Sequence, residues 1–255
     1  MALGMPKNWN RFFNRRFLKY LIIPFAVLSF ASLILFDIYN RSLPDISNVA
    51  VIGPVSSKVL DRNGVLLYEI HGETKRTPVE LEEISPNLIK ATLAIEDKDF
   101  YDHNGISISS IVRAAYENYK AKEITQGGST ITQQLVKLNL LTTERTYERK
   151  IKEAILSLKI EKRYEKDEIL EMYLNRIPYG RNTYGAEAAS LAYFAKHAKD
   201  LTLAESAYLA SLPKAPSLYS PTGASAGELE NRKNHILDLM NGLGYISAEE
   251  KDAAK

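Results

Sequence analysis

Two stretches of the sequence gather side chains that can transfer protons and bind anions. The first, AIEDKDFYDHNG over residues 94–105, holds Glu96 at the C-terminal end of a predicted helix, with Asp97 and Asp99 close by. The negative end of a helix dipole and neighbouring acids both favour the protonated form of a carboxylate, so Glu96 can serve as a general base near neutral pH. A solvated acidic helix end explains the same pattern, and by charge alone this alternative is the stronger one.

The second stretch, GGSTITQQLVK over residues 127–137, is rich in small hydrogen-bonding groups. Ser129 or Thr130 can cap a helix whose free N–H groups favour an anion, and the two glycines let the backbone approach a ligand closely. Gln133 and Lys137 are four residues apart and share a helix face. The pattern suits a phosphorylated or sugar-rich ligand, although it lacks the GxxxxGK[ST] spacing of a P-loop. A well-capped helix with a surface lysine remains the alternative.

A stripe of charge follows on the next predicted helix. Arg145, Arg149 and Glu153 recur at helical spacing, and Glu153 can neighbour both Arg149 and Lys150. A structural ion-pair ladder is the usual explanation of such a helix. The functional interpretation is a cationic wall for pyrophosphate with one acid set within it.

The elements that must position these residues are mainly helical. After Ser85-Pro86, a cap followed by a proline at the first helical position, the pattern is helical to the end of the chain. A β-hairpin is predicted around Asn63-Gly64. Thr202 and Glu205 form a capping box. Helices are predicted over residues 86–97, 129–141, 143–164, 166–177, 184–198, 201–212 and 228–246.

The first part of the chain differs from the rest. Residues 1–19 carry only basic charges, and residues 20–36 carry none, which predicts a membrane-spanning helix of roughly 20 residues with its basic flank in the cytoplasm. A cleaved signal peptide is the weaker alternative, because the apolar run is long and no small-x-small cleavage site follows it. Residues 37–57 are interpreted as a linker.

The composition excludes several kinds of chemistry. The chain has 255 residues, a net charge of +2 and no cysteine, so it has neither a polyanion-binding charge excess nor thiolate chemistry. The histidines are scattered and form no metal-binding motif.

Several motifs occur in a characteristic order: EDKDFYDHNG, GGSTITQQLVK, RKIKEA, KDEILEMYLNRIPYG and LTLAESAYLASLPKAPSLYSP. Together they resemble the family 51 peptidoglycan glycosyltransferases, the transglycosylase domains of class A penicillin-binding proteins and of monofunctional transglycosylases. The resemblance implies a mainly α, lysozyme-like fold with two lobes, the smaller one dipping into the membrane near residues 106–126. Residues 58–245 would be the glycosyltransferase domain, and residues 246–255 the start of a truncated helix or of a linker to a following domain.

The resemblance also implies an activity, the polymerisation of lipid II into glycan strands on the outer face of the cell membrane. Its partners would be lipid II, the growing strand, the membrane and other cell-wall synthesis proteins, but no nucleic acid. Glu96 matches the base that takes a proton from the acceptor hydroxyl, and the reaction inverts C1 and releases undecaprenyl pyrophosphate. Glu153 matches a second essential acid, which either holds a divalent metal (Mg or Mn) or orients the cations around it.

The remaining matches concern binding. The residues expected to steady the pyrophosphate are Lys137, Arg145 and Lys150. The other positions expected in the cleft are Asp97, Phe100, His103, Ser129, Thr130, Gln133, Gln134 and Arg149.

The sequence departs from the family pattern at two positions, where Leu138 replaces an asparagine and Ala195 replaces a common glycine. Two other functions stay open. A lysozyme-like enzyme that cleaves glycans would share the fold, but it needs no cationic set. An inactive membrane-anchored scaffold would not need Glu96 and Glu153.

Overall fold

A computed structural model describes most of the chain beyond residue 74. The described residues are 22–27, 29–30, 37, 39–41, 43–49, 57–63, 66–70, 75–122, 127–141, 144, 146–180, 182–214 and 226–255. The chain forms two compact units, Met1–Pro44 and Asp45–Lys255. Among the residues described, no helix has both the length and the apolar character needed to cross a membrane. Much of the predicted span over residues 20–36 lies outside the described residues.

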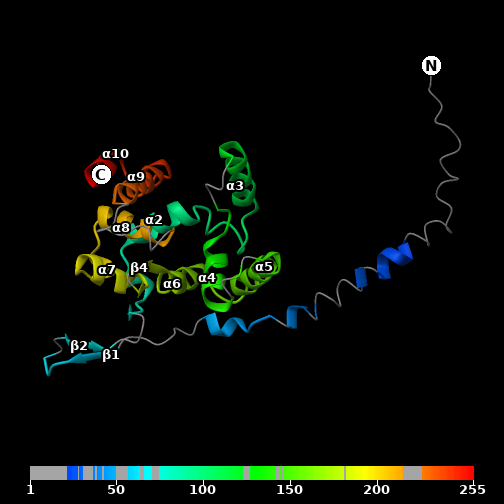
Figure 1. The fold of residues 1–255 in the computed structure, drawn as a ribbon, viewed down its shortest axis with the longest axis horizontal. Coiled ribbons are helices and arrows are strands. Elements are labelled where there is room, and N and C mark those ends of the chain that lie inside the picture. The colour runs from blue at the N-terminus through cyan, green and yellow to red at the C-terminus, as the bar shows by residue number, and fades with distance from the viewer. Residues whose placement is uncertain are drawn as a thin grey trace, which may run out of the picture. The chain divides into compact units, whose positions relative to one another are not determined.

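The second unit is mainly helical, as the sequence predicts (Figure 1). Its α-helices are α2 (Pro86–Glu96), α3 (Ile108–Ala121), α4 (Ile131–Leu140), α5 (Tyr147–Glu161), α6 (Lys166–Leu174), α7 (Ala186–Phe194), α8 (Leu203–Ser211), α9 (Ala226–Gly242) and α10 (Ala248–Ala254). Short 3-10 helices are η2 (Ile46–Val49), η3 (Leu81–Glu83), η4 (Ala198–Asp200) and η5 (Leu212–Lys214).

The strands are few and short. Strands β1 (Ser57–Leu60) and β2 (Leu66–Ile70) pair antiparallel, which confirms the predicted hairpin. A second sheet has the order β3-β5-β4 and is built from β3 (Lys75–Arg76), β4 (Pro178–Gly180) and β5 (Thr183–Tyr184). In it β3 runs parallel to β5 and β4 antiparallel.

Helix starts follow the predicted capping residues. The Ser85 hydroxyl accepts from the backbone N–H of Asn87, with Pro86 at the first helical position of α2. Thr202 and Glu205 form the capping box of α8. Each such cap stabilises a helix by about 1 kcal/mol, because it satisfies N–H groups that the helix itself leaves free.

Two groups of helices surround the buried side chains. Helix α2 packs against α8 and α9, and α4 packs against α5 and α6. The fully buried side chains include Leu88 on α2, Leu135 on α4 and Ile236 on α9. Burying a side chain of this size stabilises the fold by about 2 kcal/mol. The C-terminal end of α2, which carries Glu96, lies close to α4, because Gln134 of α4 bonds Glu96 and the backbone N–H of Ile131 bonds Asp97.

Two segments differ from the sequence-based expectation. Residues 108–121 form helix α3, which the hydrophobic pattern did not predict, and most of its apolar side chains, including Ile108 and Tyr119, are exposed. The predicted linker over residues 37–57 contains η2, which packs against α4 and α5 and has Val49 fully buried. The folded unit therefore includes residues that the sequence assigns to a linker.

Candidate active site

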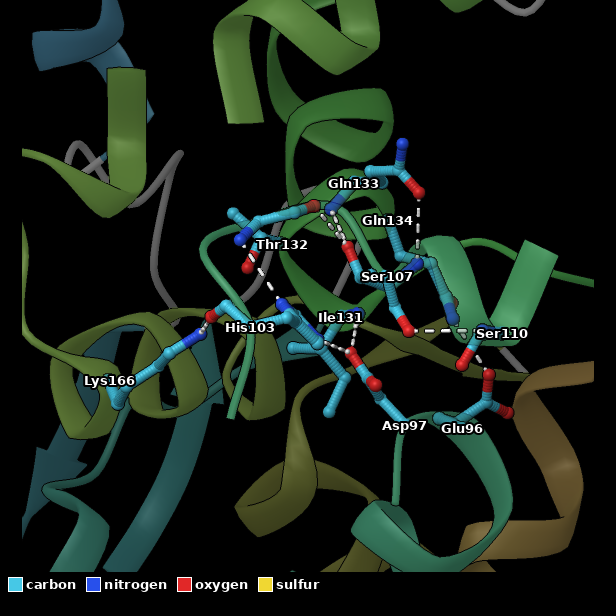
Figure 2. A network of polar contacts seen from close by, with 12 residues as sticks. Glu96, Asp97, His103, Ser107, Ser110, Ile131, Thr132, Gln133, Gln134 and Lys166 are labelled. Atoms are coloured by element: carbon cyan, nitrogen blue, oxygen red, sulfur yellow. Dashed lines mark hydrogen bonds and ion pairs between the residues drawn. The ribbon is translucent and has the colours of Figure 1, made fainter. Parts of the chain in front are cut away.

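The carboxylate of Glu96 lies at the C-terminal end of α2 and is held by a side-chain amide. Gln134 Nε2, in the first turn of α4, donates to Glu96 Oε2 at 2.8 Å, as Figure 2 shows. On its other oxygen, Oε1, the carboxylate lies 3.9 Å from Arg232 Nη2 of α9. The Glu96 side chain is 17% exposed, so the group is oriented by the protein and is still accessible from solvent.

Two buried tyrosines complete the surroundings of Glu96. Tyr173 Oη of α6 donates to Gln134 Oε1 at 3.2 Å. Burial, with the charge of Glu96 as the next cause, raises the pKa of Tyr173 well above its ordinary value. Burial and the same charge also raise the pKa of Tyr179 of β4. Both phenols therefore stay protonated at neutral pH.

Asp97 has a different environment from Glu96, although the two residues are adjacent. Its side chain is buried, and Oδ2 accepts from the backbone N–H of Ile131 at 2.9 Å and bonds His103 Nε2 at 2.9 Å (Figure 2). His103 Nδ1 accepts from the backbone N–H of Gly105 at 3.1 Å. The ring proton is therefore on Nε2, which donates the hydrogen bond to Asp97. Asp97 thus connects the end of α2 to the start of α4.

The loop between α2 and α3 is held in place by the partly buried side chain of Lys166, which sequence reasoning missed. Lys166 Nζ donates to the carbonyl of His103 at 2.6 Å and to Glu161 Oε1 at 2.9 Å. The same ammonium lies 4.4 Å from the centre of the fully buried Phe100 ring. Gly105 has φ +85°, and an added Cβ would approach Ser157 O to 2.9 Å, so a glycine is required there.

The residues that begin α4 divide into structural and accessible groups. Thr130 is the N-cap and forms a capping box with Gln133, and its hydroxyl also donates to the Gly105 carbonyl at 2.7 Å. Both side chains are buried. The hydroxyl of Ser129 instead accepts from Lys150 Nζ at 2.7 Å. Of the two predicted caps, Thr130 takes this role, and Ser129 turns toward α5.

Glu153 holds a pair of cations on α5. Its Oε2 accepts from Arg149 Nη1 at 2.7 Å, and its Oε1 accepts from Lys150 Nζ. The Glu153 side chain is 3% exposed, whereas that of Lys150 is 46% exposed. The buried acid therefore fixes two cations whose outer faces reach solvent, an arrangement that can stabilise an anion.

The structure brings most of the sequence-predicted residues together around the start of α4. Gln134 joins Glu96 to α4, and Ser129 joins the Arg149–Lys150–Glu153 cluster to the same segment. Lys137 lies exposed on α4, and in the described part of the chain it makes no hydrogen bond or ion pair. Phe100, being fully buried, offers no surface to a ligand. Arg145 lies outside the described residues.

The side chains around Glu153 do not form a site for a divalent metal. Both of its oxygens are bonded to cationic groups, and Mg²⁺ and Mn²⁺ require several oxygen ligands instead. In the described residues, no cluster of three or more His, Asp or Glu side chains could hold an ion. The geometry fits the other role considered for this acid, that of orienting the cations.

The two departures from the family pattern have different structural settings. Ala195 ends α7 in the left-handed conformation, with φ 55°, which explains why a glycine suits this position. Leu138 is 40% exposed. The Asn139 side chain donates to the Leu135 carbonyl within its own helix at 2.8 Å. It therefore does not substitute for the asparagine side chain that the family has at position 138.

Sequence reasoning missed Arg232 and Tyr173 as neighbours of Glu96. Arg232 Nε donates to the Ser211 carbonyl at 3.1 Å, which places its guanidinium between the end of α8 and the carboxylate. Both residues lie within ordinary amphipathic helices, so no local signal distinguishes them from packing residues. Only the association of α2 with α9, and of α4 with α6, reveals their position.

Comparison with known proteins defines the class of protein to which this site belongs. A family model described as Transglycosylase matches residues 63–241, and the chain therefore belongs to the transglycosylase family. This confirms the family that the motifs resemble.

Particular relatives are named penicillin-binding proteins. The chain is 46% identical over 200 residues to penicillin-binding protein 1F of Bacillus subtilis strain 168, covering 78% of this chain and 28% of the relative. It is 45% identical over 235 residues to penicillin-binding protein 1A of Aquifex aeolicus strain VF5, covering 91% and 32%. The chain thus spans about a third or less of the length of these relatives.

A solved structure is also similar. The crystal structure of penicillin-binding protein 1A from Haemophilus influenzae, at 2.6 Å resolution, matches 80% of this chain and 20% of that chain. The sequence identity is 29% and the TM-score is 0.43.

Proposed function

We propose that this chain is a membrane-anchored peptidoglycan glycosyltransferase that polymerises lipid II into glycan strands. The observation that carries the proposal is the carboxylate of Glu96, oriented by Gln134 and open to solvent, beside a segment that also contacts a cation cluster. Membership of the transglycosylase family supports the reaction class. The penicillin-binding names of the relatives support a role in the cell wall.

In the proposed reaction Glu96 is the general base. It takes the proton from the 4-hydroxyl of the acceptor N-acetylglucosamine. The hydroxyl oxygen then forms a bond to C1 of the donor N-acetylmuramic acid from the face opposite the leaving group, so C1 is inverted. The bond from C1 to the pyrophosphate oxygen breaks, and undecaprenyl pyrophosphate leaves with the electron pair. Positioned base catalysis of this kind contributes roughly 10²–10⁴-fold.

The leaving pyrophosphate would be stabilised by the cations of α4 and α5. Lys150 and Arg149 are held in place by Glu153, and Lys137 lies exposed on α4. Fixed cations aimed at developing negative charge stabilise a transition state without reorganising during the reaction. In this proposal Glu153 orients the cations, and no step passes through a metal ion.

The proposed location is the outer face of the cell membrane. The uncharged run over residues 20–36, with its basic flank, supports a single anchor with a cytoplasmic N-terminus. The exposed apolar side chains of α3, among them Ile108, Val112 and Tyr119, support a membrane-dipping lobe in a lysozyme-like, two-lobed arrangement. Tethering would confine enzyme and lipid-linked substrate to one surface and raise their effective concentration.

The test is polymerisation of labelled lipid II in detergent, with the wild-type chain beside Glu96→Gln. We expect a ladder of glycan strands from the wild type and a loss of at least about a hundredfold in the variant, because an amide cannot accept the proton. Thermal unfolding of both proteins checks that the variant is folded.

The other outcomes distinguish the competing functions. Release of fragments from finished peptidoglycan would indicate a glycan-cleaving enzyme. A folded wild-type protein that binds lipid II and forms no strands would indicate a scaffold. Equal activity of the wild type and Glu96→Gln would show that another group is the base.

A further inference from the structure

Gln134 lies between an accepting carboxylate and a buried phenol. Its Nε2 donates to Glu96 Oε2 at 2.8 Å, and its Oε1 accepts from Tyr173 Oη at 3.2 Å. The three residues come from α4, α2 and α6. Tyr173 is fully buried, so it has no surface with which to touch a substrate. The hydrogen-bonded route from Tyr173 to Glu96 therefore runs through Gln134.

Tyr173 decides which end of the Gln134 amide faces the base. An ionised carboxylate only accepts hydrogen bonds, so Glu96 needs the NH₂ end of the amide. The other end, the carbonyl, then needs a donor. Burial, reinforced by the charge of Glu96, raises the pKa of Tyr173 well above its ordinary value, so its O–H remains a donor across the working pH range. Without this donor the carbonyl of Gln134 would lose its hydrogen-bond partner, and the amide would no longer be held in one orientation.

We propose that Tyr173 is a positioning residue for the reaction, which acts through the Gln134 amide to orient the Glu96 carboxylate. This inference rests on the proposed function, since it assigns Glu96 the role of base. A hydrogen bond to the ionised form of a base favours that form. The Tyr173–Gln134 pair therefore sets the direction of the Glu96 carboxylate.

Other charged and titratable groups also face Glu96 and must be considered in any pH measurement. Arg232 reaches it from α9 at 3.9 Å. Tyr173 and Tyr179 interact with its charge from α6 and β4. Asp97 is the adjacent residue, but its carboxylate bonds Ile131 and His103. Substituting Tyr173 leaves all of these groups except its own hydroxyl in place.

The chain supplies a matched control in Tyr179. Tyr179 is fully buried and close enough to Glu96 for the charge to raise its pKa, as at Tyr173. Its hydroxyl has no hydrogen-bond partner among the described residues. Tyr179→Phe therefore removes the same atom from a similar environment without breaking a link to Gln134.

The experiment compares Tyr173→Phe with Tyr179→Phe in lipid II polymerisation, using the 255-residue chain in detergent. For Tyr173→Phe we expect kcat to fall about tenfold with KM unchanged, since the lost bond acts on the base and not on substrate binding. We also expect the acidic limb of its pH–rate profile to move to higher pH, because the Gln134 amide that donates to the ionised carboxylate is no longer held in place. Tyr179→Phe should keep kcat within about twofold and leave the profile in place.

A double-mutant cycle tests the relay itself. Gln134→Met removes the amide and keeps a side chain of similar length. If Tyr173 acts through Gln134, adding Tyr173→Phe to Gln134→Met changes kcat by less than about twofold, whereas independent effects would multiply. Thermal unfolding of each variant separates lost activity from lost folding.

Two results would overturn the inference. One is a Tyr173→Phe variant whose kcat and pH–rate profile match those of Tyr179→Phe. The other is full multiplicativity of Tyr173→Phe and Gln134→Met. Either result, together with a wild-type chain that polymerises lipid II and a Glu96→Gln variant that does not, rejects the relay and leaves the proposed function intact. Failure of the wild type to polymerise, or equal activity in Glu96→Gln, rejects the assignment of the base, and the relay with it.

Discussion

Glu96 and Glu153 are both connected to the segment around the start of α4, and their carboxylates have different partners. Glu96 accepts from the neutral amide of Gln134, and its nearest cation, Arg232, is 3.9 Å away. Glu153 accepts from two cations at once, Arg149 and Lys150. The Glu96 side chain is 17% exposed, and that of Glu153 is 3% exposed.

The difference shows how one residue type can serve two purposes. A general base must have an oxygen that a substrate proton can reach, and the neutral, partly exposed setting of Glu96 leaves one accessible. Both oxygens of Glu153 are already bonded to cations, so this acid is suited to hold those cations in place. We therefore expect the two residues to respond differently to the same substitution.

Shortening each acid by one methylene group should give the largest contrast. In Glu96→Asp the carboxylate withdraws from Gln134, and a misplacement of about 1 Å in a reacting group costs about a hundredfold in kcat. In Glu153→Asp the long side chains of Arg149 and Lys150 can follow the carboxylate, so we expect a loss below about tenfold. Polymerisation kinetics on lipid II measure both. Equal losses would contradict the division of roles.

Removing the Glu153 carboxylate should reduce stability. Glu153→Ala leaves Arg149 and Lys150 close together without their counter-charge, and we expect the free energy of unfolding to fall by about 2 kcal/mol. This is less than for a fully buried pair, because the cations can regain water. The melting temperature should drop by about 5 °C. Glu153→Gln, which keeps the shape and one of the two accepting oxygens, should lose less. An unchanged melting temperature in Glu153→Ala would show that the cluster is not structural.

Arg232 should have a smaller effect, on activity. Arg232→Met removes a guanidinium 3.9 Å from Glu96, and an ion pair of this length in a partly exposed site corresponds to about a threefold loss of kcat. Arg232→Lys keeps the positive charge and should recover part of the rate. If both variants lose the same activity, the bond from Arg232 to the Ser211 carbonyl matters more than the charge.

Salt should produce the smallest effect, and it should act on the exposed cations and not on Glu96. Lys137 and Lys150 are exposed, so raising ionic strength from about 0.1 M to about 0.5 M screens their attraction for pyrophosphate. We expect kcat/KM for lipid II to fall about twofold, because these cations are proposed both to bind the pyrophosphate and to stabilise its departure, whereas Glu96 is less exposed than Lys150. A neutral osmolyte at matched osmolality is the control. An unchanged kcat/KM would show that the exposed lysines do not act on the pyrophosphate.

Contacts between residues that are close along the chain were predicted from the sequence. The cap of α2 by Ser85 and the capping box of Thr202 and Glu205 involve residues within three positions of one another, and both were predicted. The proximity of Glu153 to Arg149 and Lys150 follows from helical periodicity, so it too was visible in the sequence. Helix α3 escaped prediction because most of its apolar side chains remain exposed, and its pattern therefore does not resemble that of a core helix.

The residues that tune Glu96 were beyond the reach of local patterns. Gln134 is separated from Glu96 by 38 positions, and Tyr173 from Gln134 by 39. Nothing in a helical repeat indicates that a buried tyrosine faces an amide on another helix. The motif match placed Gln134 in the cleft, but its role as the partner of Glu96 depends on the packing of α2, α4 and α6.

The sequence by itself therefore determined most of the helices, several of their caps, the cation cluster of Glu153 and the family. These depend on backbone hydrogen bonding and on side chains three or four residues apart, which any helix brings together. Only the tertiary structure decided which polar groups surround Glu96, because helix packing selects neighbours by shape and burial across the whole chain. The same type of side chain is a candidate base at position 96 and a counter-ion at position 153 for that reason.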